Sequence, residues 1–446
     1  MEYHDYKDSG IEWIGEIPVL WSTSKIKYLS PVKRGASPRP IDDPKFFDEV
    51  GEYSWVRIAD VSASNKYLVT TTQKMSKIGS LLSVRLSPGE MFLSIAGTVG
   101  KPCITQVKCC IHDGFVYFPK LEQKLKEYLY YIFETGLPYK GLGKLGTQLN
   151  LNTETVGDIS IPIPKEAEIS KIINFIKVND KHINKLILNY KKQIKTLQQY
   201  RQSLITETVT KGLNPDVKMK DSGVEWIGEI PEHWGLTKIK YTTYVKGRIG
   251  WQGLRSDEFI DEGPHLVTGT DFENGRISWN KCYHISEKRY KEAPAIQLKE
   301  SDLLITKDGS IGKLAIVEGK PDQAILNSGI FVTRPLKSDY IPKYLFWMLS
   351  SDVFKNYIEY FSSGSTIKHL YQETFVNFSY QFPDLIEQNE IVKYLGKKTS
   401  EIDTVIKTIK NQIEILTDYK KSLLYEAVTG KIDVRNYTES DLEVEI

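Results

Sequence analysis

The stretch KEAEISKIINFIKVNDKHINKLILNYKKQIKTLQQYRQSLITETVTKG, residues 165–212, decides the fold of this chain. No proline interrupts it, and its apolar residues recur at the spacing of a helix that buries one narrow stripe. The stripe occupies two positions of a heptad and consists of Ile183, Ile187, Tyr190, Ile194, Leu197 and Leu204. Lys, Gln and Asn fill most other positions, so this stretch is predicted to be a long helix that pairs with another helix.

The same pattern returns near the end of the chain, in IEQNEIVKYLGKKTSEIDTVIKTIKNQIEILTDYKKSLLYEAVTGKI, residues 386–432. The stripe of this second stretch consists of Ile402, Ile406, Ile409, Ile413, Leu416 and Leu423. Arg201 and Lys420 interrupt the two stripes at the same heptad position, and each directly follows a tyrosine. The partner of the first helix is therefore predicted to be its own copy, running antiparallel to it.

A repeated connector precedes each half of the chain. Residues 7–28 read KDSGIEWIGEIPVLWSTSKIKY, and residues 220–241 read KDSGVEWIGEIPEHWGLTKIKY. The match indicates an internal duplication with a period of roughly 215 residues. Its glycines, proline and aromatic residues predict a packed connector. A ligand site around Trp13 and Trp226 is the alternative, but the same sequence in both halves favours a scaffold role.

The chain is thus predicted to repeat the order of connector, variable block and long helix. The predicted boundaries are an N-terminal connector at 1–28, a first block at 29–164, a central helical region at 165–219, a repeated connector at 220–241, a second block at 242–383 and a C-terminal helical region at 384–446. The predicted fold class is α+β, with two homologous β-rich α/β modules, an antiparallel coiled coil of two long helices, and internal pseudo-twofold symmetry.

The two variable blocks contain short β-branched and aromatic runs bounded by Gly and Pro, which predict strands. These runs lie at 56–61, 90–105 and 115–119 in the first block, and at 265–272, 302–317 and 329–335 in the second. One short helix is predicted in each block, at 122–135 and at 341–361. The residues shared between the blocks are mostly Gly, apolar and turn residues, whereas the differing ones are polar, basic and aromatic.

Composition limits the classes of function. Among 446 residues, 59 basic and 57 acidic side chains leave a net charge of +2, so a nucleic-acid surface must be a local patch. The four cysteines (Cys103, Cys109, Cys110 and Cys282) form no C-x-x-C pair and are expected to be reduced thiols. The histidines show no metal-ligand spacing. Without a signal peptide or a membrane-spanning run, a cytoplasmic location is expected.

The layout resembles the specificity subunit of type I restriction–modification systems over essentially the whole chain. Four paired features carry the resemblance. They are the W-I-G-E-I-P connectors (Trp13–Pro18, Trp226–Pro231), the G-T/S-x-G-K turns (Gly97–Lys101, Gly309–Lys313), the segments around Thr147 and Thr366, and the two long helices. Each feature is weak by itself, but their order and duplication together are specific.

The resemblance implies two target recognition domains, each of which reads one half of a split double-stranded DNA sequence. It also implies that the helical pair fixes the unread gap and docks the partner subunits. Those partners would be two modification subunits, which methylate adenine with S-adenosylmethionine, and two restriction subunits, which translocate and cleave DNA with ATP and Mg²⁺. This chain itself would bind no cofactor and catalyse no reaction.

Side chains that suit DNA lie in both blocks. Arg and Lys recognise guanine or phosphate, and Asn and Gln recognise adenine. The first block offers Lys33, Arg34, Ser37, Arg39, Arg57, Lys101, Lys144, Thr147, Gln148 and Asn150. The second offers Lys246, Arg248, Trp251, Gln252, Arg255, Lys307, Lys313, Thr366, Lys368 and His369. The stretch around Arg248 is the strongest single candidate, because it combines glycines for close approach with three kinds of DNA-competent side chain, although each basic residue could instead be a solvated surface charge.

Other functions find less support. The chain contains no N/D-P-P-Y/F/W string for adenine methylation and no G-x-x-x-x-G-K-S/T loop for ATP hydrolysis. Asp113 with residues 122 and 124, and Asp308 with residues 318 and 320, match a nuclease pattern only loosely. A duplicated coiled-coil adaptor remains an alternative. Such an adaptor would tend to keep its two binding surfaces alike, whereas these blocks differ at their polar positions.

Overall fold

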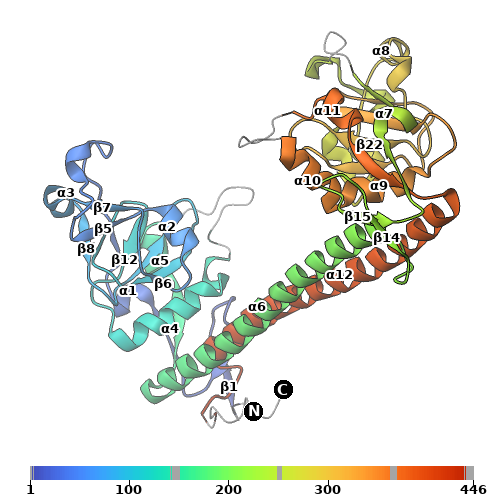
Figure 1. The fold of residues 1–446 in the computed structure, drawn as a ribbon. Helices are drawn as coiled ribbons and strands as arrows, with labels where there is room; N and C mark the ends of the chain where they lie inside the picture. Colours follow the sequence, from blue (N-terminus) through green and yellow to red (C-terminus); the bar gives the residue numbers. More distant parts are fainter. Residues whose placement is uncertain are drawn as a thin grey trace. The chain divides into compact units, whose positions relative to one another are not determined.

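The computed structural model describes residues 3, 5–140, 142, 151–248, 254–361, 369–435 and 437. The chain forms two compact units, the first made of Met1–Tyr190 and Asn411–Ile446 and the second of Lys191–Lys410. Each unit contains one variable block together with part of each long helix (Figure 1). The predicted duplication can therefore be compared unit by unit.

The two predicted long helices are present. Helix α6 spans Glu166–Lys211 with 46 residues, and helix α12 spans Leu385–Thr429 with 45 residues. Each helix ends at a glycine with a positive φ, 76° at Gly212 and 74° at Gly430. A residue with a side chain rarely adopts this left-handed conformation, so the two glycines terminate the helices at matching points.

Burial along these helices follows the heptad stripe. In the first unit Ile183 and Leu423 are buried, and the stripe residues 187, 190, 413 and 416 are half-buried. In the second unit Ile402, Ile406 and Ile409 are buried, and the stripe residues 194, 197 and 204 are half-buried. Most residues at other heptad positions are exposed. One narrow apolar stripe therefore meets a partner helix, which is the packing of a coiled coil.

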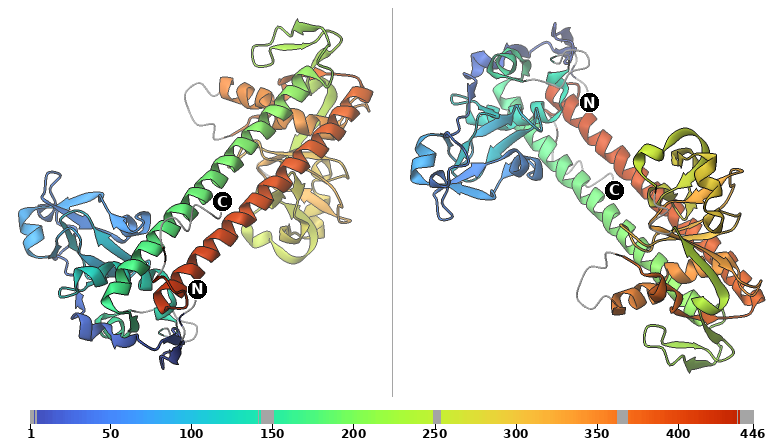
Figure 2. Two further views of the ribbon diagram at one scale, coloured as in Figure 1. Left: turned by 90° about the horizontal axis from the view of Figure 1, so that it is seen from below. Right: turned by 90° about the horizontal axis from the view of Figure 1, so that it is seen from above.

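The polar interruptions of the stripe show the direction of pairing. In the first unit Lys420 of α12 forms an ion pair with Asp180 of α6, and its Nζ lies 3.2 Å from Asn184 Oδ1. In the second unit Arg201 Nε of α6 lies 3.0 Å from Asp403 Oδ1 of α12. The end of each helix thus meets the beginning of the other, and within each unit the helices are antiparallel and side by side (Figure 2).

The first unit contains two main sheets. The larger has the order β4-β12-β9-β10-β6, and the smaller has the order β7-β5-β11-β8. Their strands are β4 (Lys33–Arg34), β5 (Tyr53–Val56), β6 (Tyr67–Leu68), β7 (Gln73–Met75), β8 (Val84–Leu86), β9 (Met91–Ser94), β10 (Pro102–Thr105), β11 (Cys109–Ile111) and β12 (Phe115–Tyr117). Helix α4 (Gln123–Glu134) packs beside the start of α6, where both helices contribute to one apolar core.

The second unit repeats this arrangement. Its larger sheet has the order β17-β25-β22-β23-β20-β19, and its smaller sheet has the order β21-β18-β24. The strands are β17 (Thr243–Gly247), β18 (Ile260–Val267), β19 (Phe272–Glu273), β20 (Arg276–Ile277), β21 (Tyr283–His284), β22 (Leu303–Thr306), β23 (Leu314–Ile316), β24 (Ala324–Leu326) and β25 (Ile330–Pro335). In both units one parallel pair, β5 with β11 and β18 with β24, builds the smaller sheet.

Smaller elements complete each unit. Two-stranded pairs join β1 with β2, β3 with β13, β14 with β15, and β16 with β26. Their bounds are β1 (Tyr6–Asp8), β2 (Glu16–Pro18), β3 (Ser22–Lys25), β13 (Ser160–Ile163), β14 (Met219–Asp221), β15 (Glu229–Pro231), β16 (Gly235–Lys238) and β26 (Ser379–Phe382). The short helices are α1 (Ile26–Leu29), α2 (Ile58–Ala63), α3 (Lys77–Leu81), α5 (Thr153–Asp158), α7 (Ile239–Thr242), α8 (Glu287–Lys291), α9 (Pro342–Ser350), α10 (Asp352–Phe361) and α11 (Gln372–Val376).

Three local predictions were wrong. The predicted strand at 56–61 is mostly helix α2, because the Asp60 carboxylate accepts the backbone N–H of Arg57 at 2.9 Å and caps the helix start. The single helix predicted at 341–361 is two helices, α9 and α10, separated at the extended residue Ser351. Thr206 of α6 accepts the backbone N–H of Asp352 at 3.0 Å, so a tertiary contact supports the second start. The blocks also contain more short helices than the one predicted for each.

The repeated connectors pack against the long helices. Trp21 and Trp234 are each 1% exposed. The indole N–H of Trp21 donates to Glu168 Oε2 at 2.7 Å, and that of Trp234 donates to Glu387 Oε2 at 2.7 Å. The two tryptophans therefore attach the connectors to the first turns of α6 and α12 in the same way, which agrees with a scaffold role.

Candidate functional site

Two turns meet at one edge of the larger sheet in each unit. In the first unit the β9–β10 turn and the β11–β12 turn are joined by the Ile95 N–H, which donates to the Gly114 carbonyl at 2.8 Å. In the second unit the Lys307 N–H donates to the Gly329 carbonyl at 2.7 Å. We call these surfaces the turn edges: residues 95–101 with 112–114 in the first unit, and 307–313 with 327–329 in the second.

The paired G-T/S-x-G-K segments form the first turn of each edge. Their glycines have positive φ values, 65° at Gly97, 84° at Gly100, 66° at Gly309 and 82° at Gly312. At Gly100 an added Cβ would also lie 2.7 Å from the Tyr139 ring. Each segment leads into a strand instead of a helix, so it is a β-turn and lacks the helix N-terminus on which a phosphate-binding loop depends.

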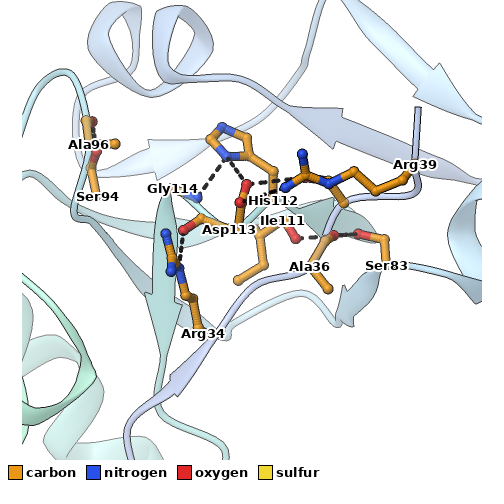
Figure 3. A network of polar contacts seen from close by, with 11 residues as sticks. Arg34, Ala36, Arg39, Ser83, Ser94, Ala96, Ile111, His112, Asp113 and Gly114 are labelled. Carbon is orange, nitrogen blue, oxygen red and sulfur yellow. Dashed lines mark hydrogen bonds and ion pairs between the residues drawn. The ribbon is translucent and has the colours of Figure 1, made fainter. Parts of the chain in front are cut away.

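An arginine network lies on the turn edge of the first unit (Figure 3). Arg34 Nε donates to the Asp113 carbonyl at 2.5 Å, and Arg39 Nη2 donates to Asp113 Oδ2 at 3.3 Å. The Ser37 hydroxyl donates to Asp113 Oδ1 at 3.3 Å. The Arg39 side chain is 77% exposed. One turn residue therefore holds two guanidinium groups at a surface where they can reach an anionic or acceptor-rich ligand.

His112 has a structural role in the same turn. Its Nδ1 accepts the Gly114 backbone N–H at 2.8 Å, and its ring lies 4.5 Å from the Phe115 ring centroid. Burial lowers the pKa of His112, which favours the neutral ring. Since Nδ1 is the acceptor, the proton of the neutral imidazole is on Nε2. His112 therefore stabilises the turn that contains Asp113.

The other described candidates of the first unit occupy separate places. Lys33 and Arg57 are exposed, and the Arg57 guanidinium donates to Gln73. Lys101 is half-buried, and its amine donates to the carbonyls of Ser62 at 3.0 Å and Ser64 at 2.7 Å. Lys101 thus holds the end of α2 against the β9–β10 turn, a structural contact that the sequence pattern did not indicate.

The turn edge of the second unit has different polar side chains from that of the first. His369 Nδ1 is paired with Asp308 Oδ1, and its ring lies 4.8 Å from the Tyr371 centroid. The Lys307 amine lies 5.2 Å from the Phe331 ring centroid. Asp308 and Lys307 occupy the positions that Ala96 and Ile95 occupy in the first unit. Lys246, Arg255 and Lys313 are exposed.

The structure corrects the prediction made for Arg248. Its side chain is 4% exposed, and its Nε and Nη2 donate to the Leu326 carbonyl at 3.0 and 2.8 Å. Burial is the main reason that its pKa falls to about 10. The equivalent carbonyl in the first unit, that of Ile111, accepts the Ala36 backbone N–H at 3.1 Å. The guanidinium of Arg248 thus supports the end of β24 and is buried instead of exposed on the surface.

Replacing Arg248 with methionine should destabilise the second unit by about 2–4 kcal/mol, because a buried carbonyl loses a charged donor. The measurement is the free energy of unfolding from denaturant titration. Arg255→Met is the matched control, since Arg255 is exposed, and should change stability by about 0.5 kcal/mol or less. If Arg248→Met kept full stability but altered DNA selectivity, the structural role assigned to Arg248 would be wrong.

Eight candidates lie outside the described residues, namely Lys144, Thr147, Gln148, Asn150, Trp251, Gln252, Thr366 and Lys368. For the exposed candidates that are described, contact with DNA stays a prediction. Sequence reasoning did not select Asp113 or Asp308 as site residues because it searched for basic and amide side chains. Asp113 precedes Gly114 and Asp308 precedes Gly309, and this position beside a turn glycine was the available signal.

The acidic residues of the loose nuclease matches have other partners in the structure. Asp113 contacts arginines, Asp308 contacts His369, and Glu318 pairs with Arg276 at 3.2 Å and with Lys343 at 2.7 Å. Within the described part of the chain, no group of three or more His, Cys, Asp and Glu side chains could hold a metal ion. Nor do the described helices include one long and apolar enough to cross a membrane.

The sequence was compared with protein families and with characterised relatives. The family model described as "Type I restriction modification DNA specificity domain" matches residues 18–196 and 254–415. The specificity subunit of the type I restriction enzyme MjaVIII from Methanocaldococcus jannaschii is 23% identical over 436 residues, covering 94% of this chain and 95% of that protein. The EcoBI specificity subunit from Escherichia coli is 22% identical over 290 residues, covering 64% of this chain and 61% of that protein.

Solved structures share the fold. A chain from a structure titled as the basis of complex assembly and conformational transition of the type I R-M system aligns with a TM-score of 0.69 at 14% identity, covering 93% of this chain and 99% of that one. The HsdS subunit from Thermoanaerobacter tengcongensis aligns with a TM-score of 0.50 at 15% identity, covering 97% and 100%. At these identities the likeness shows the fold alone.

Proposed function

Because this chain belongs to the type I restriction–modification DNA specificity family, we propose that each of its two units reads one half of a split double-stranded DNA target. One observation carries the proposal. The two turn edges share their backbone hydrogen bonding, but they differ in their polar side chains. Asp113 contacts Arg34 and Arg39 in one unit, and Asp308 contacts His369 in the other. A common framework with different donors and acceptors is what reading two different half-sites requires.

The helical pair serves in this proposal as the spacer between the half-sites and as the docking surface for partner subunits. Large apolar side chains are exposed at equivalent heptad positions of the two helices. They are Leu186 at 42% and Val405 at 47%, and Tyr200 at 57% and Tyr419 at 54%. A surface that occurs twice suits two copies of one partner. We therefore assign two modification subunits to this surface, with two restriction subunits joining the complete complex.

Catalysis belongs to those partners in this proposal. S-adenosylmethionine would bind the modification subunits, and ATP and Mg²⁺ would bind the restriction subunits. The residues of this chain select the sequence and hold the assembly together. The adaptor alternative is less well supported, because a simple adaptor has no need for two sheet edges that differ in charge and hydrogen-bonding groups.

A binding experiment tests the proposal. Since the net charge of the chain is only +2, we expect weak DNA binding by this chain alone and tight, salt-sensitive binding once modification subunits are added. The dissociation constant should fall by at least about a hundredfold on assembly. Adenine methylation mapped in a host that expresses the complex should show an asymmetric split motif. Equal affinity with and without the modification subunits, or an unsplit motif, would contradict the proposal.

A further inference from the structure

The arginine network on the turn edge of the first unit contains a carboxylate that general DNA affinity does not explain. Asp113 lies 3.3 Å from Arg39 Nη2 and carries a negative charge at a surface proposed to approach phosphates. A carboxylate there opposes binding to any DNA through repulsion. Its presence beside two arginines therefore requires another function.

Stability does not supply that function. The Asp113 side chain is 43% exposed and that of Arg39 is 77% exposed. An ion pair between groups so accessible to water contributes little to folding. The turn itself is held without the carboxylate, since the Ile95 N–H donates to the Gly114 carbonyl and the Gly114 N–H donates to Nδ1 of the His112 ring. The carboxylate is thus dispensable for the shape of the turn.

The geometry indicates a function for the Asp113 carboxylate. Asp113 engages Arg34 through its carbonyl at 2.5 Å and engages Arg39 and Ser37 through its carboxylate. The two contacts engage part of each guanidinium, and both arginines are otherwise exposed. A flexible arginine that is held before binding loses less conformational freedom and accepts fewer alternative partners. The equivalent position in the second unit is Ser328, which has no carboxylate.

We propose that Asp113 is a positioning residue that sets the base selectivity of the first unit by orienting Arg34 and Arg39 and by opposing non-specific binding. This inference rests on the proposed function, because it assigns a role in DNA reading. Asp113 holds Arg39 toward base edges that accept hydrogen bonds, and a wrong base leaves that arginine bound to Asp113. Selectivity in this arrangement comes from a competing internal partner as well as from the new contact.

The test uses the complete complex with its modification subunits. The split motif is first mapped by adenine methylation in a host without other adenine methylation. Duplexes with the mapped target and with single-base changes in either half are then compared for binding by parent and D113N complexes. We expect D113N to lose about tenfold discrimination in one half-site only, and to bind unrelated duplex about two- to fivefold more tightly at low salt.

Three control variants make the outcome specific. Glu52→Gln removes the same charge from an exposed ion pair with Lys108 and should leave discrimination unchanged. Arg39→Gln leaves Asp113 in place and should affect the same half-site as D113N, which keeps the inference testable if D113N folds poorly. Ser328→Ala changes the matched turn of the second unit and should leave that half-site unaffected.

The possible results separate the inference from the proposed function. Unchanged discrimination by D113N, or an equal loss in both half-sites, overturns the positioning role while the split motif of the parent complex still supports the proposed function. The absence of a split motif in the parent complex contradicts the proposed function itself. Loss of discrimination confined to one half-site, and shared by D113N and Arg39→Gln, supports both.

Discussion

Inserting one heptad into both long helices should lengthen the unread gap of the DNA target by about three base pairs. Seven helical residues add about 10 Å at 1.5 Å per residue, and B-DNA advances about 3.4 Å per base pair. Arg201 pairs with Asp403 and the helices are antiparallel, so an insertion after Leu197 of α6 is matched by one near Ile406 of α12. Both half-site sequences should stay the same, because neither turn edge changes.

Methylation mapping is the measurement, and a single insertion is the control. A heptad added to α6 alone moves the later stripe residues of that helix by two turns relative to α12 and separates Arg201 from Asp403. We expect this variant to lose stability and specific methylation. Changed half-sites at an unchanged gap would show that the helical pair is not the spacer.

Replacing Trp21 with alanine should lower the free energy of unfolding by about 3–5 kcal/mol, the usual effect of deleting a buried tryptophan. Trp21 is 1% exposed, and its indole N–H donates to Glu168, which is itself 8% exposed. The substitution therefore leaves a cavity and removes a donor from a buried carboxylate. Tyr3 is a further donor to Glu168 at 3.1 Å, so the carboxylate is not left without a partner.

The duplication supplies the matched control for this prediction. Trp234→Ala removes the equivalent ring of the second unit, but the Glu387 side chain is 23% exposed and also contacts His233 at 3.0 Å. We expect Trp234→Ala to cost less than Trp21→Ala by about 1 kcal/mol, because water can solvate Glu387. Trp21→Phe keeps most of the packing and should lose about 1–3 kcal/mol. Equal costs for the two alanine variants would mean that the carboxylates play no part.

Local periodicity made much of the fold predictable. The heptad stripe, the repeated connectors and the turn glycines each depend on residues close together in the chain. Helix α6 begins at Glu166, one residue after the start predicted at 165. The G-T/S-x-G-K segments form turns, as predicted. The failures at 56–61 and at Ser351 occurred where a carboxylate cap or a contact with α6 overrode the local pattern.

The candidate site was less predictable, because the role of a charged side chain depends on what surrounds it. Residue type and neighbouring glycines ranked the stretch around Arg248 first, and Asp113 was considered only as part of a loose nuclease match. The fold buries Arg248 against the Leu326 carbonyl and places Asp113 between two exposed arginines. The neighbouring sequence shows that Asp113 lies beside a turn glycine, but it does not show which groups Asp113 or Arg248 contacts, since those partners lie far away in the chain.

The sequence by itself determined the duplication, the two long helices, their interrupted stripes and the family, because these follow from repetition and from helical spacing. The tertiary structure alone decided which polar side chains are presented and which are buried. Arg201 and Lys420 illustrate the division. Their matching positions are visible in the sequence, but their carboxylate partners, Asp403 and Asp180, follow only from the antiparallel register of the helices.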